Sequence, residues 1–208
     1  MPTPDFDLYL VTDRNQTHGR DLLWVLESAL DGGVEAIQLR EKDLGGRELY
    51  FLAEAVRKLT QRYHARLLIN DRIDIALAVD ADGVQLATHS LPIETARNLL
   101  GRQAIIGAST HSLEEAKEAE RNGADFILFG PVYFTPSKAV YGSPQGLSAL
   151  KNVVEKIPLP IYAIGGIKPE NIADARCAGV RGVALISAIV GAADPRAATK
   201  KILNLLKR

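Results

Sequence analysis

Residues 104–129 read AIIGASTHSLEEAKEAERNGADFILF, and they contain one full copy of the pattern that decides the fold. Ala104–Ile106 is a short apolar run that predicts a buried strand. Ser112, with a glutamate three positions later, is typical of the residue that precedes a helix, and Gly123 is typical of a helix end. Phe126–Phe129 is a second apolar run. The stretch therefore predicts a strand, a helix and a further strand.

The same alternation continues along the whole chain, without a low-complexity linker. Several of the apolar runs are continuous rather than alternating, which is typical of parallel strands buried on both faces. Eight strand-then-helix units in 208 residues predict an α/β fold, a single-domain (β/α)8 TIM barrel of parallel strands over residues 1–208. The eight runs are Leu8–Val11, Ala36–Leu39, Leu67–Ile69, Gly83–Leu86, Ala104–Ile106, Phe126–Phe129, Ile161–Ile164 and Val183–Ile186.

An open, doubly wound sheet is the alternative fold for such a pattern. That fold usually has fewer strands and often carries a glycine-rich phosphate loop after its first strand. Here the first apolar run is followed by Thr12-Asp13-Arg14, which is no such loop. The sequence therefore favours the barrel.

Three further helices have readable ends. Asp21 or Arg20 begins the first of them, and the longest helix is expected from about Gly46 to Tyr63. Pro169 predicts the first turn of a later helix, and Gly179 predicts its end.

The charges balance, with 25 basic and 25 acidic side chains. This balance gives no general electrostatic reason to expect nucleic acid or an anionic membrane as a partner. No apolar run approaches the length of a membrane span, and the first residues lack the apolar region of a signal peptide. The only cysteine, Cys177, excludes an intrachain disulfide, and we expect it to be a small buried residue of a helix. We therefore expect a cytoplasmic protein.

Active sites of these barrels lie at the C-terminal ends of the strands, so the residues that follow each run are the candidates. The second run leads into Gln38-Leu-Arg40-Glu-Lys42. Alternation places Gln38 and Arg40 on one side, and Lys42 reaches the same region if the strand continues. Two cations and an amide suit a ligand with two or more negative charges. A solvated charged loop is the alternative.

The third and fifth runs are followed by smaller polar groups. Asp71, after Asn70, is a candidate Mg²⁺ ligand, because this cation prefers oxygen donors and shares them with substrate phosphates. Asp71 as the cap of the next helix is the alternative, and both roles can coexist. After the fifth run, Ser112 is expected to cap a helix, which leaves Ser109 and His111 as candidates. A lone histidine at a helix start is more often structural, so His111 is left out of the chemistry.

The sixth run is followed by the longest loop, residues 130–146, whose glycine and proline content suits a mobile lid. Lys138 within it is placed to neutralise a leaving group, and an ordinary surface loop is the alternative. Gly165 and Gly166 follow the seventh run, and Ser187 follows the eighth. Glycines let backbone N–H groups approach an anion, and these two loops form the usual phosphate site of such barrels. Glycine retained for tight packing is the alternative here.

These segments, in this order, resemble the thiamine phosphate synthase family and its thiazole tautomerase sister group over nearly the whole chain. The motifs are Leu8-Tyr-Leu-Val-Thr-Asp13, Gln38-Leu-Arg-Glu-Lys42, Asn70-Asp71, Ser109-Thr-His111, Phe129-Gly-Pro-Val132, Thr135-Pro-Ser-Lys138, Ala163-Ile-Gly-Gly-Ile167 and Ser187-Ala-Ile189. The resemblance implies a transferase that couples hydroxymethylpyrimidine diphosphate to hydroxyethylthiazole phosphate with the help of Mg²⁺. It also suggests a homodimer.

The resemblance further implies a role for each matching residue. Asp71 would bind Mg²⁺, and Arg40, Lys42 and Lys138 would stabilise the departing diphosphate. The residues that would hold the pyrimidine diphosphate are Gln38, Arg40, Lys42, Asn70, Ser109 and Lys138. Those near the thiazole phosphate would be Thr135, Pro136, Ser137, Gly165, Gly166, Ile186 and Ser187. The implied reaction is a dissociative substitution, in which diphosphate leaves before the thiazole nitrogen captures the pyrimidine cation.

One stretch departs from the family pattern. Residues 85–90 read Gln-Leu-Ala-Thr-His-Ser, where the family usually has His-x-Gly-Gln-x-Asp with a second metal-binding aspartate. Ser90 offers a neutral oxygen at that position, so we expect weaker metal binding. The same loss favours a thiazole phosphate tautomerase, in which His89 or His111 would supply acid–base catalysis. That group, however, places a catalytic histidine where this chain has Pro131. A non-catalytic barrel that binds thiazole or thiamine phosphate is the third possibility.

Overall fold

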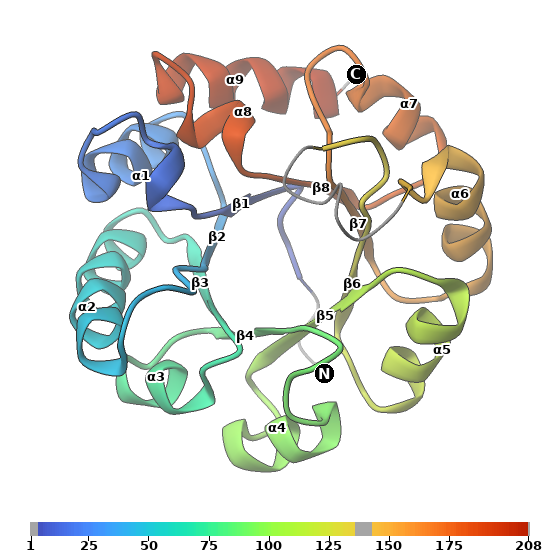
Figure 1. Cartoon of the computed structure of the whole chain (residues 1–208), viewed down its shortest axis with the longest axis horizontal. Coiled ribbons are helices and arrows are strands. Elements are labelled where there is room, and N and C mark those ends of the chain that lie inside the picture. Colours follow the sequence, from blue (N-terminus) through green and yellow to red (C-terminus); the bar gives the residue numbers. More distant parts are fainter. Residues whose placement is uncertain (1–3, 136–142, 208) are drawn as a thin grey trace.

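The computed structural model describes residues 4–135 and 143–207. Eight parallel strands close into a barrel in the order of the chain, and helices surround it (Figure 1). The strands are β1 (Leu8–Val11), β2 (Ala36–Leu39), β3 (Arg66–Asn70), β4 (Gly83–Leu86), β5 (Ile105–Thr110), β6 (Phe126–Phe129), β7 (Ile161–Ile164) and β8 (Gly182–Leu185). The predicted (β/α)8 barrel is confirmed.

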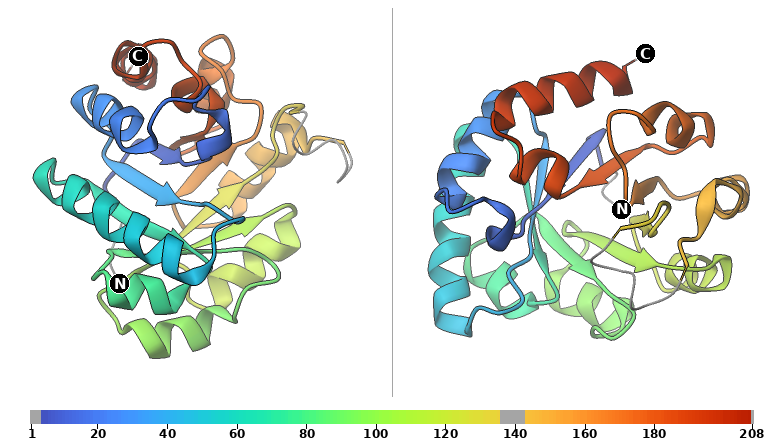
Figure 2. Two further views of the ribbon diagram at one scale, coloured as in Figure 1. Left: turned by 60° about the vertical axis from the view of Figure 1, so that its left-hand side comes forward. Right: turned by 45° about the horizontal axis from the view of Figure 1, so that its top comes forward.

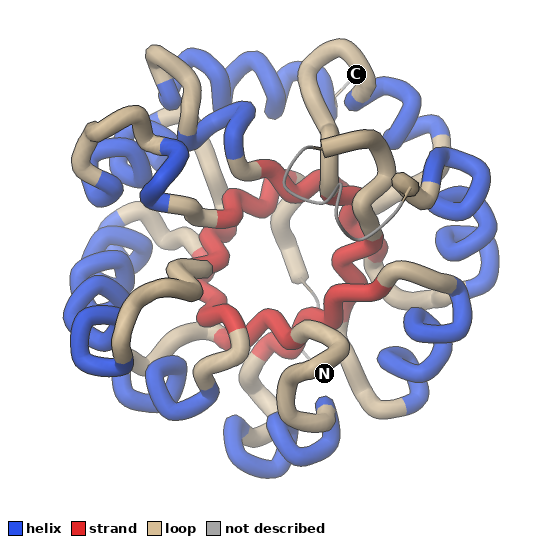
Figure 3. The backbone as a smooth tube through the Cα atoms, in the orientation of Figure 1, coloured by secondary structure: helices blue, strands red, loops and turns tan. Residues whose placement is uncertain are grey.

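The outer layer consists mainly of α-helices, as the backbone tube in Figure 3 shows. The helices are the 3-10 helix η1 (Arg14–Gln16), α1 (Leu22–Asp31), α2 (Gly46–Arg62), α3 (Ile73–Ala78), α4 (Ile93–Leu100), α5 (Leu113–Arg121), α6 (Gly146–Lys156), α7 (Ile172–Cys177), α8 (Ser187–Val190) and α9 (Pro195–Leu206). None of the helices in the described part of the chain has the length and apolar character needed to cross a membrane.

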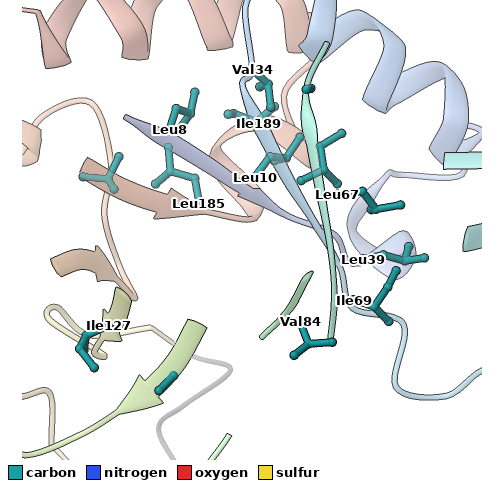
Figure 4. Packing of buried hydrophobic residues seen from close by; sticks show 14 of the residues in the cluster. Leu8, Leu10, Val34, Leu39, Leu67, Ile69, Val84, Ile127, Leu185 and Ile189 are labelled. Carbon is teal, nitrogen blue, oxygen red and sulfur yellow. The ribbon is translucent and has the colours of Figure 1, made fainter. Parts of the chain in front are cut away.

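Each strand separates two hydrophobic cores, because alternate side chains point into the barrel and out toward the helices. Leu8 and Leu10 of β1 belong to the outer core, together with Ile37 of β2 and Leu185 of β8. Figure 4 shows part of this layer. Tyr9 of β1 belongs instead to the inner core. The continuous apolar runs of the sequence are thus explained by burial on both faces.

Four aromatic rings fill the N-terminal half of the barrel interior. Phe6, Tyr9, Phe126 and Tyr162 are completely buried, and the ring centroids of Phe6 and Tyr162 lie 4.9 Å apart. The Tyr162 hydroxyl donates a hydrogen bond to the carbonyl oxygen of Phe6 at 2.6 Å. This packing closes one end of the barrel and leaves the polar side chains at the other end. Figure 2 shows the strands running in one direction toward that end.

Local sequence patterns set several helix ends as predicted. Asp21 caps α1, since its carboxylate accepts from the backbone N–H of Trp24 at 2.9 Å. Ser112 caps α5 through the N–H of Glu115 at 3.1 Å. The Glu115 carboxylate reaches back to the N–H of His111 at 2.6 Å, one residue before the cap, so the predicted cap is present but the second bond of a capping box goes to a different N–H.

Other boundaries differ from the prediction. Strand β5 continues to Thr110, so Ser109 lies within the strand rather than after it. Strand β8 ends at Leu185, and Ile186 is the residue that precedes α8. Pro169 does not begin α7, which starts at Ile172. A turn precedes the helix, in which the N–H of Lys168 donates to the Asn171 side chain at 2.8 Å.

Cys177 is exposed, so its expected burial was wrong. Helix α7 buries Ile172 and Ala175, which lie three residues apart and face the barrel. Cys177 lies outside that stripe, on the solvent side of the helix. The position of Cys177 relative to the buried residues Ile172 and Ala175 therefore explains why Cys177 is exposed.

Candidate active site

Two buried glutamines form the floor of the C-terminal barrel mouth. Gln38 of β2 and Gln85 of β4 point into the barrel and are 2% and 1% exposed. The Gln38 amide donates to Asn70 Oδ1 at 2.9 Å, and the Gln85 amide donates to Ser109 Oγ at 3.0 Å. The two Oε1 atoms have no hydrogen-bond partner among the described residues. Four neighbouring strands, β2 to β5, therefore contribute one polar layer.

The orientation of Gln38 follows from that of Asp71. The Asp71 carboxylate only accepts hydrogen bonds when ionised, so the Asn70 side chain turns its NH₂ group toward Asp71 Oδ2, at 2.8 Å. Asn70 Oδ1 then faces Gln38 and requires the Gln38 NH₂ group as its donor. This chain of amides fixes Gln38 Oε1 as an acceptor at the base of the mouth.

Asp71 also contacts the loop that follows β4. The Ser90 hydroxyl donates to Asp71 Oδ1, and the backbone N–H of Ala87 donates to Ser90 Oγ at 2.6 Å. His89 Nε2 lies 4.0 Å from Asp71 Oδ2. Asp71 has a positive φ of 60°, and α3 has no side-chain cap, so the alternative that Asp71 caps this helix was wrong.

The donor set around Asp71 is sparse for a metal centre. Within residues 4–135 and 143–207, no three His, Cys, Asp or Glu side chains lie close enough to hold a metal ion. Asp71 and Ser90 together offer one carboxylate and one neutral oxygen. Mg²⁺ often binds proteins through one or two carboxylates and takes its remaining ligands from water and substrate phosphates. The residues present therefore fit an ion that is shared with a phosphorylated ligand.

The loop after β2 carries the cations and is anchored by a buried acid. Strand β2 ends at Leu39, so strand alternation does not extend to Lys42, which is exposed. Arg40 is partly exposed, and its backbone N–H donates to the Thr12 hydroxyl at 2.9 Å. The side chain of Glu41 is 1% exposed and accepts from the backbone N–H of Arg14 at 3.1 Å. The alternative, a solvated charged loop, therefore holds for Lys42 but not for Glu41.

The loops after β6 and β7 pack closely through glycines. Gly165 and Gly166 have φ values of 89° and 66°. A Cβ atom at Gly165 would lie 2.5 Å from Pro131 Cβ, and one at Gly166 would lie 2.7 Å from Tyr133 Cβ. Tyr133 also donates its backbone N–H to Gly165 O at 2.9 Å. Tight packing, the alternative explanation, is therefore a sufficient reason for both glycines.

The structure brings the predicted residues to one end of the barrel in two groups. Gln38, Asn70 and Asp71 form one hydrogen-bonded chain, and Ser109 is bonded to Gln85 on the neighbouring strand. Gly165, Gly166, Ile186 and Ser187 follow the adjacent strands β7 and β8. Thr135 is the last described residue before the gap, and Pro136, Ser137 and Lys138 lie outside the described residues.

The sequence interpretation missed Gln85 as a site residue. The signal was a glutamine within the apolar run Gly83–Leu86, at the inward-facing position of the strand. His111 follows β5, and its Nδ1 contacts the carbonyl oxygen of Gly130, which follows β6.

A closed parallel barrel with a polar layer at the C-terminal ends of its strands defines an enzyme of the (β/α)8-barrel class. The chain belongs to the thiamine monophosphate synthase family, whose model matches residues 8–189. A relative from Geobacter sulfurreducens is 55% identical over 206 residues, which cover 99% of this chain and 97% of the relative. The thiamine-phosphate synthase of Clostridium novyi is 45% identical, over 97% of this chain and 98% of its own. The solved structure of a thiamine phosphate pyrophosphorylase from Pyrococcus furiosus is similar with a TM-score of 0.88 and 42% identity, covering 97% of this chain and 96% of that one.

Proposed function

We propose that this chain is a transferase that couples hydroxymethylpyrimidine diphosphate to hydroxyethylthiazole phosphate, releasing thiamine phosphate and diphosphate. The family match over residues 8–189 and relatives named thiamine-phosphate synthase at 43–45% identity support the reaction. The hydrogen-bonded layer of Gln38, Asn70 and Asp71 at the C-terminal mouth is the structural observation that carries it. The enzyme would act in the cytoplasm on small molecules, alone or as a homodimer.

The chemistry requires little covalent participation from the protein. When diphosphate leaves, negative charge develops on it, and Arg40, Lys42 and Lys138 would offset that charge. The aminopyrimidine ring stabilises the methylene cation that remains, and the thiazole nitrogen then captures it. Exclusion of water protects this cation during its lifetime. A mouth that offers amide oxygens and cations suits this reaction.

The polar layer would hold the pyrimidine diphosphate. Gln38 Oε1, without a partner in the described structure, is an acceptor for an N–H donor of the substrate. Asn70 and Ser109 lie beside it on neighbouring strands. We add Gln85 to this group, because its side chain is buried in the same layer and contacts Ser109.

Asp71, with Ser90 beside it, would hold Mg²⁺ between the protein and the diphosphate. When bound, the ion would neutralise part of the leaving-group charge. With one carboxylate and one hydroxyl, the protein contributes fewer charges than a site with two carboxylates, so metal affinity depends on the diphosphate. Binding of Mn²⁺ as a probe, with and without inorganic diphosphate, tests this dependence directly.

The loops after β7 and β8 would hold the thiazole phosphate through backbone N–H groups. Such loops are the usual phosphate site of this fold. The residues proposed there are Gly165, Gly166, Ile186 and Ser187, together with Thr135, Pro136 and Ser137 from the loop after β6.

The decisive experiment is incubation of the purified protein with both substrates and Mg²⁺, followed by detection of thiamine phosphate by mass spectrometry. Product should require both substrates and disappear with EDTA. If no product forms while a thiamine-phosphate synthase relative turns over in the same buffer, the proposal is wrong.

A thiazole phosphate tautomerase is the second candidate, and Ser90 in place of a second carboxylate favours it. A tautomerase has no diphosphate substrate, so EDTA would not change its activity. Isomerisation of the thiazole phosphate alone, followed by nuclear magnetic resonance, distinguishes it from the transferase. Binding of the thiazole phosphate without either reaction would indicate a non-catalytic barrel.

A further inference from the structure

The segment between β1 and α1, residues 12–21, lies between the two halves of the proposed site. Strand β1 pairs with β2 on one side and with β8 on the other, so this segment borders both loops that would bind anions. It contains two arginines, Arg14 and Arg20, whose hydrogen bonds go to opposite sides. We propose that these are positioning residues, Arg14 for the loop of Arg40 and Lys42 and Arg20 for the segment of Ile186 and Ser187. The inference rests on the proposed function.

Arg14 holds the loop after β2 through Glu41, a buried acid of that loop. The backbone N–H of Arg14 donates to both carboxylate oxygens of Glu41, at 3.2 and 3.1 Å, and its guanidinium donates to Glu41 Oε2 at 3.3 Å. The same guanidinium contacts Asp43. Glu41 stands between Arg40 and Lys42 in the sequence, so fixing the Glu41 side chain inside the protein restricts where the backbone of its two neighbours can lie. Loss of the guanidinium would loosen this turn.

Arg20 holds the segment after β8 from its far end. Its guanidinium donates to Val190 O at 2.9 Å, to Ala192 O at 2.6 Å and to Thr17 O at 2.7 Å. These carbonyls of Val190 and Ala192 lie at the C-terminal end of α8. Helix α8 has only four residues, about 6 Å of rise, so an anchor at one end also fixes the other end, where Ser187 lies.

The segment that carries the two arginines has further hydrogen bonds of its own. Thr17 is 2% exposed, and its hydroxyl lies 3.0 Å from Arg14 O and 2.8 Å from Arg20 O. The carboxylate of Asp13 caps η1 through the N–H of Asn15 at 3.1 Å. The two arginines hold different loops through separate hydrogen bonds, so each variant should disturb mainly one loop.

Neither arginine is among the proposed substrate contacts, so each acts through the loop that it holds. The two variants should therefore separate the two substrates. Arg14→Ala should raise KM for the pyrimidine diphosphate about tenfold or more, because small displacements of positioning groups have effects of this size, and should leave KM for the thiazole phosphate within about twofold. Arg20→Ala should do the reverse.

Each variant is the control of the other, and the lysine variants test geometry. Lysine keeps the charge but not the fork of donors, so Arg20→Lys should recover only part of the loss. Arg47→Ala removes an exposed arginine of α2 that lies over the Phe51 ring, and it should change neither KM. Thermal unfolding of every variant checks the fold, and titration calorimetry of each substrate alone provides the same comparison without turnover.

The outcomes distinguish the inference from the function on which it rests. Opposite KM changes in the two variants support the inference. Equal changes in both substrates, or none, overturn it while the wild-type protein still makes thiamine phosphate. A wild-type protein that neither forms product nor binds the two substrates overturns the proposed function and the inference together.

Discussion

The Ser90 hydroxyl donates a hydrogen bond to the Asp71 carboxylate, although the two residues are nineteen positions apart in the chain. The contact joins the loops that follow β3 and β4. It places a neutral side chain beside the one carboxylate at this point of the mouth, where the family resemblance implies an aspartate. The charge of the proposed metal site is therefore determined by a single position, and that position can be changed.

Ser90→Asp should lower the Mg²⁺ concentration that gives half-maximal activity. A second carboxylate beside Asp71 adds a charged oxygen ligand, and carboxylates are the protein ligands that Mg²⁺ prefers. The measurement is a Mg²⁺ titration of the coupling rate, paired with calorimetric titration of Mn²⁺. Ser90→Asn, which adds bulk without charge, is the matched control. An unchanged midpoint in Ser90→Asp would show that residue 90 does not face the metal.

Lys138→Ala should reduce kcat about 100-fold or more, because one charged donor to the leaving diphosphate is lost. Lys138 lies outside the described residues, so the prediction rests on the family resemblance. Turnover at saturating substrates is the measurement. Lys151→Ala, an exposed lysine of α6, should retain wild-type kcat. Normal turnover by Lys138→Ala would count against the transferase.

Gly166→Ala should destabilise the protein by about 2–5 kcal/mol. The positive φ costs about 1–2 kcal/mol, and the new methyl overlaps Tyr133 Cβ, which adds about 1–3 kcal/mol of overpacking. Gly123→Ala is the matched control, because Gly123 has a φ of 87° but nothing within 4 Å of an added Cβ. Urea unfolding gives both free energies. Equal losses of unfolding free energy in the two variants would mean that the loop after β6 moves aside for the added methyl group at no energetic cost.

Alkaline pH should destabilise the folded protein through its buried phenols. Burial raises the pKa of Tyr162 well above its usual range, and burial does the same to the pKa of Tyr9. A raised folded-state pKa contributes stability that is complete below the unfolded pKa of about 10 and is lost as the pH rises through the folded value. Unfolding free energies from pH 8 upward should therefore fall above about pH 10.

Tyr162→Phe tests the source of this effect. It should reduce the alkaline loss of stability, and at neutral pH it should cost about 1–3 kcal/mol because Phe6 O loses its donor. Tyr50→Phe, on the outer helix α2, is the control. If the unfolding free energy falls equally with pH above about 10 in Tyr162→Phe and in wild type, the Tyr162 phenol is not the cause of the alkaline loss of stability.

Much of the fold was determined by short stretches of sequence. A strand buried on both faces requires only a few consecutive apolar residues, and a helix begins where a side chain such as Asp21 or Ser112 accepts a nearby N–H. These interactions span a few residues, so their patterns are visible in the chain. The boundaries that differed, at Ser109 and Pro169, depend on pairing with a neighbouring strand or on a turn held by Asn171.

The contacts within the candidate site were decided by the tertiary structure. The sequence by itself placed Gln38, Asn70 and Asp71 at strand ends, but it did not determine that Asp71 turns away from α3 toward Ser90. It also did not predict that Glu41 is buried against Arg14, or that Gln85 belongs to the polar layer. The physical reason is that barrel closure brings the ends of different strands together, and the partner of a buried polar group is set by register and packing between strands rather than by its neighbours in the chain.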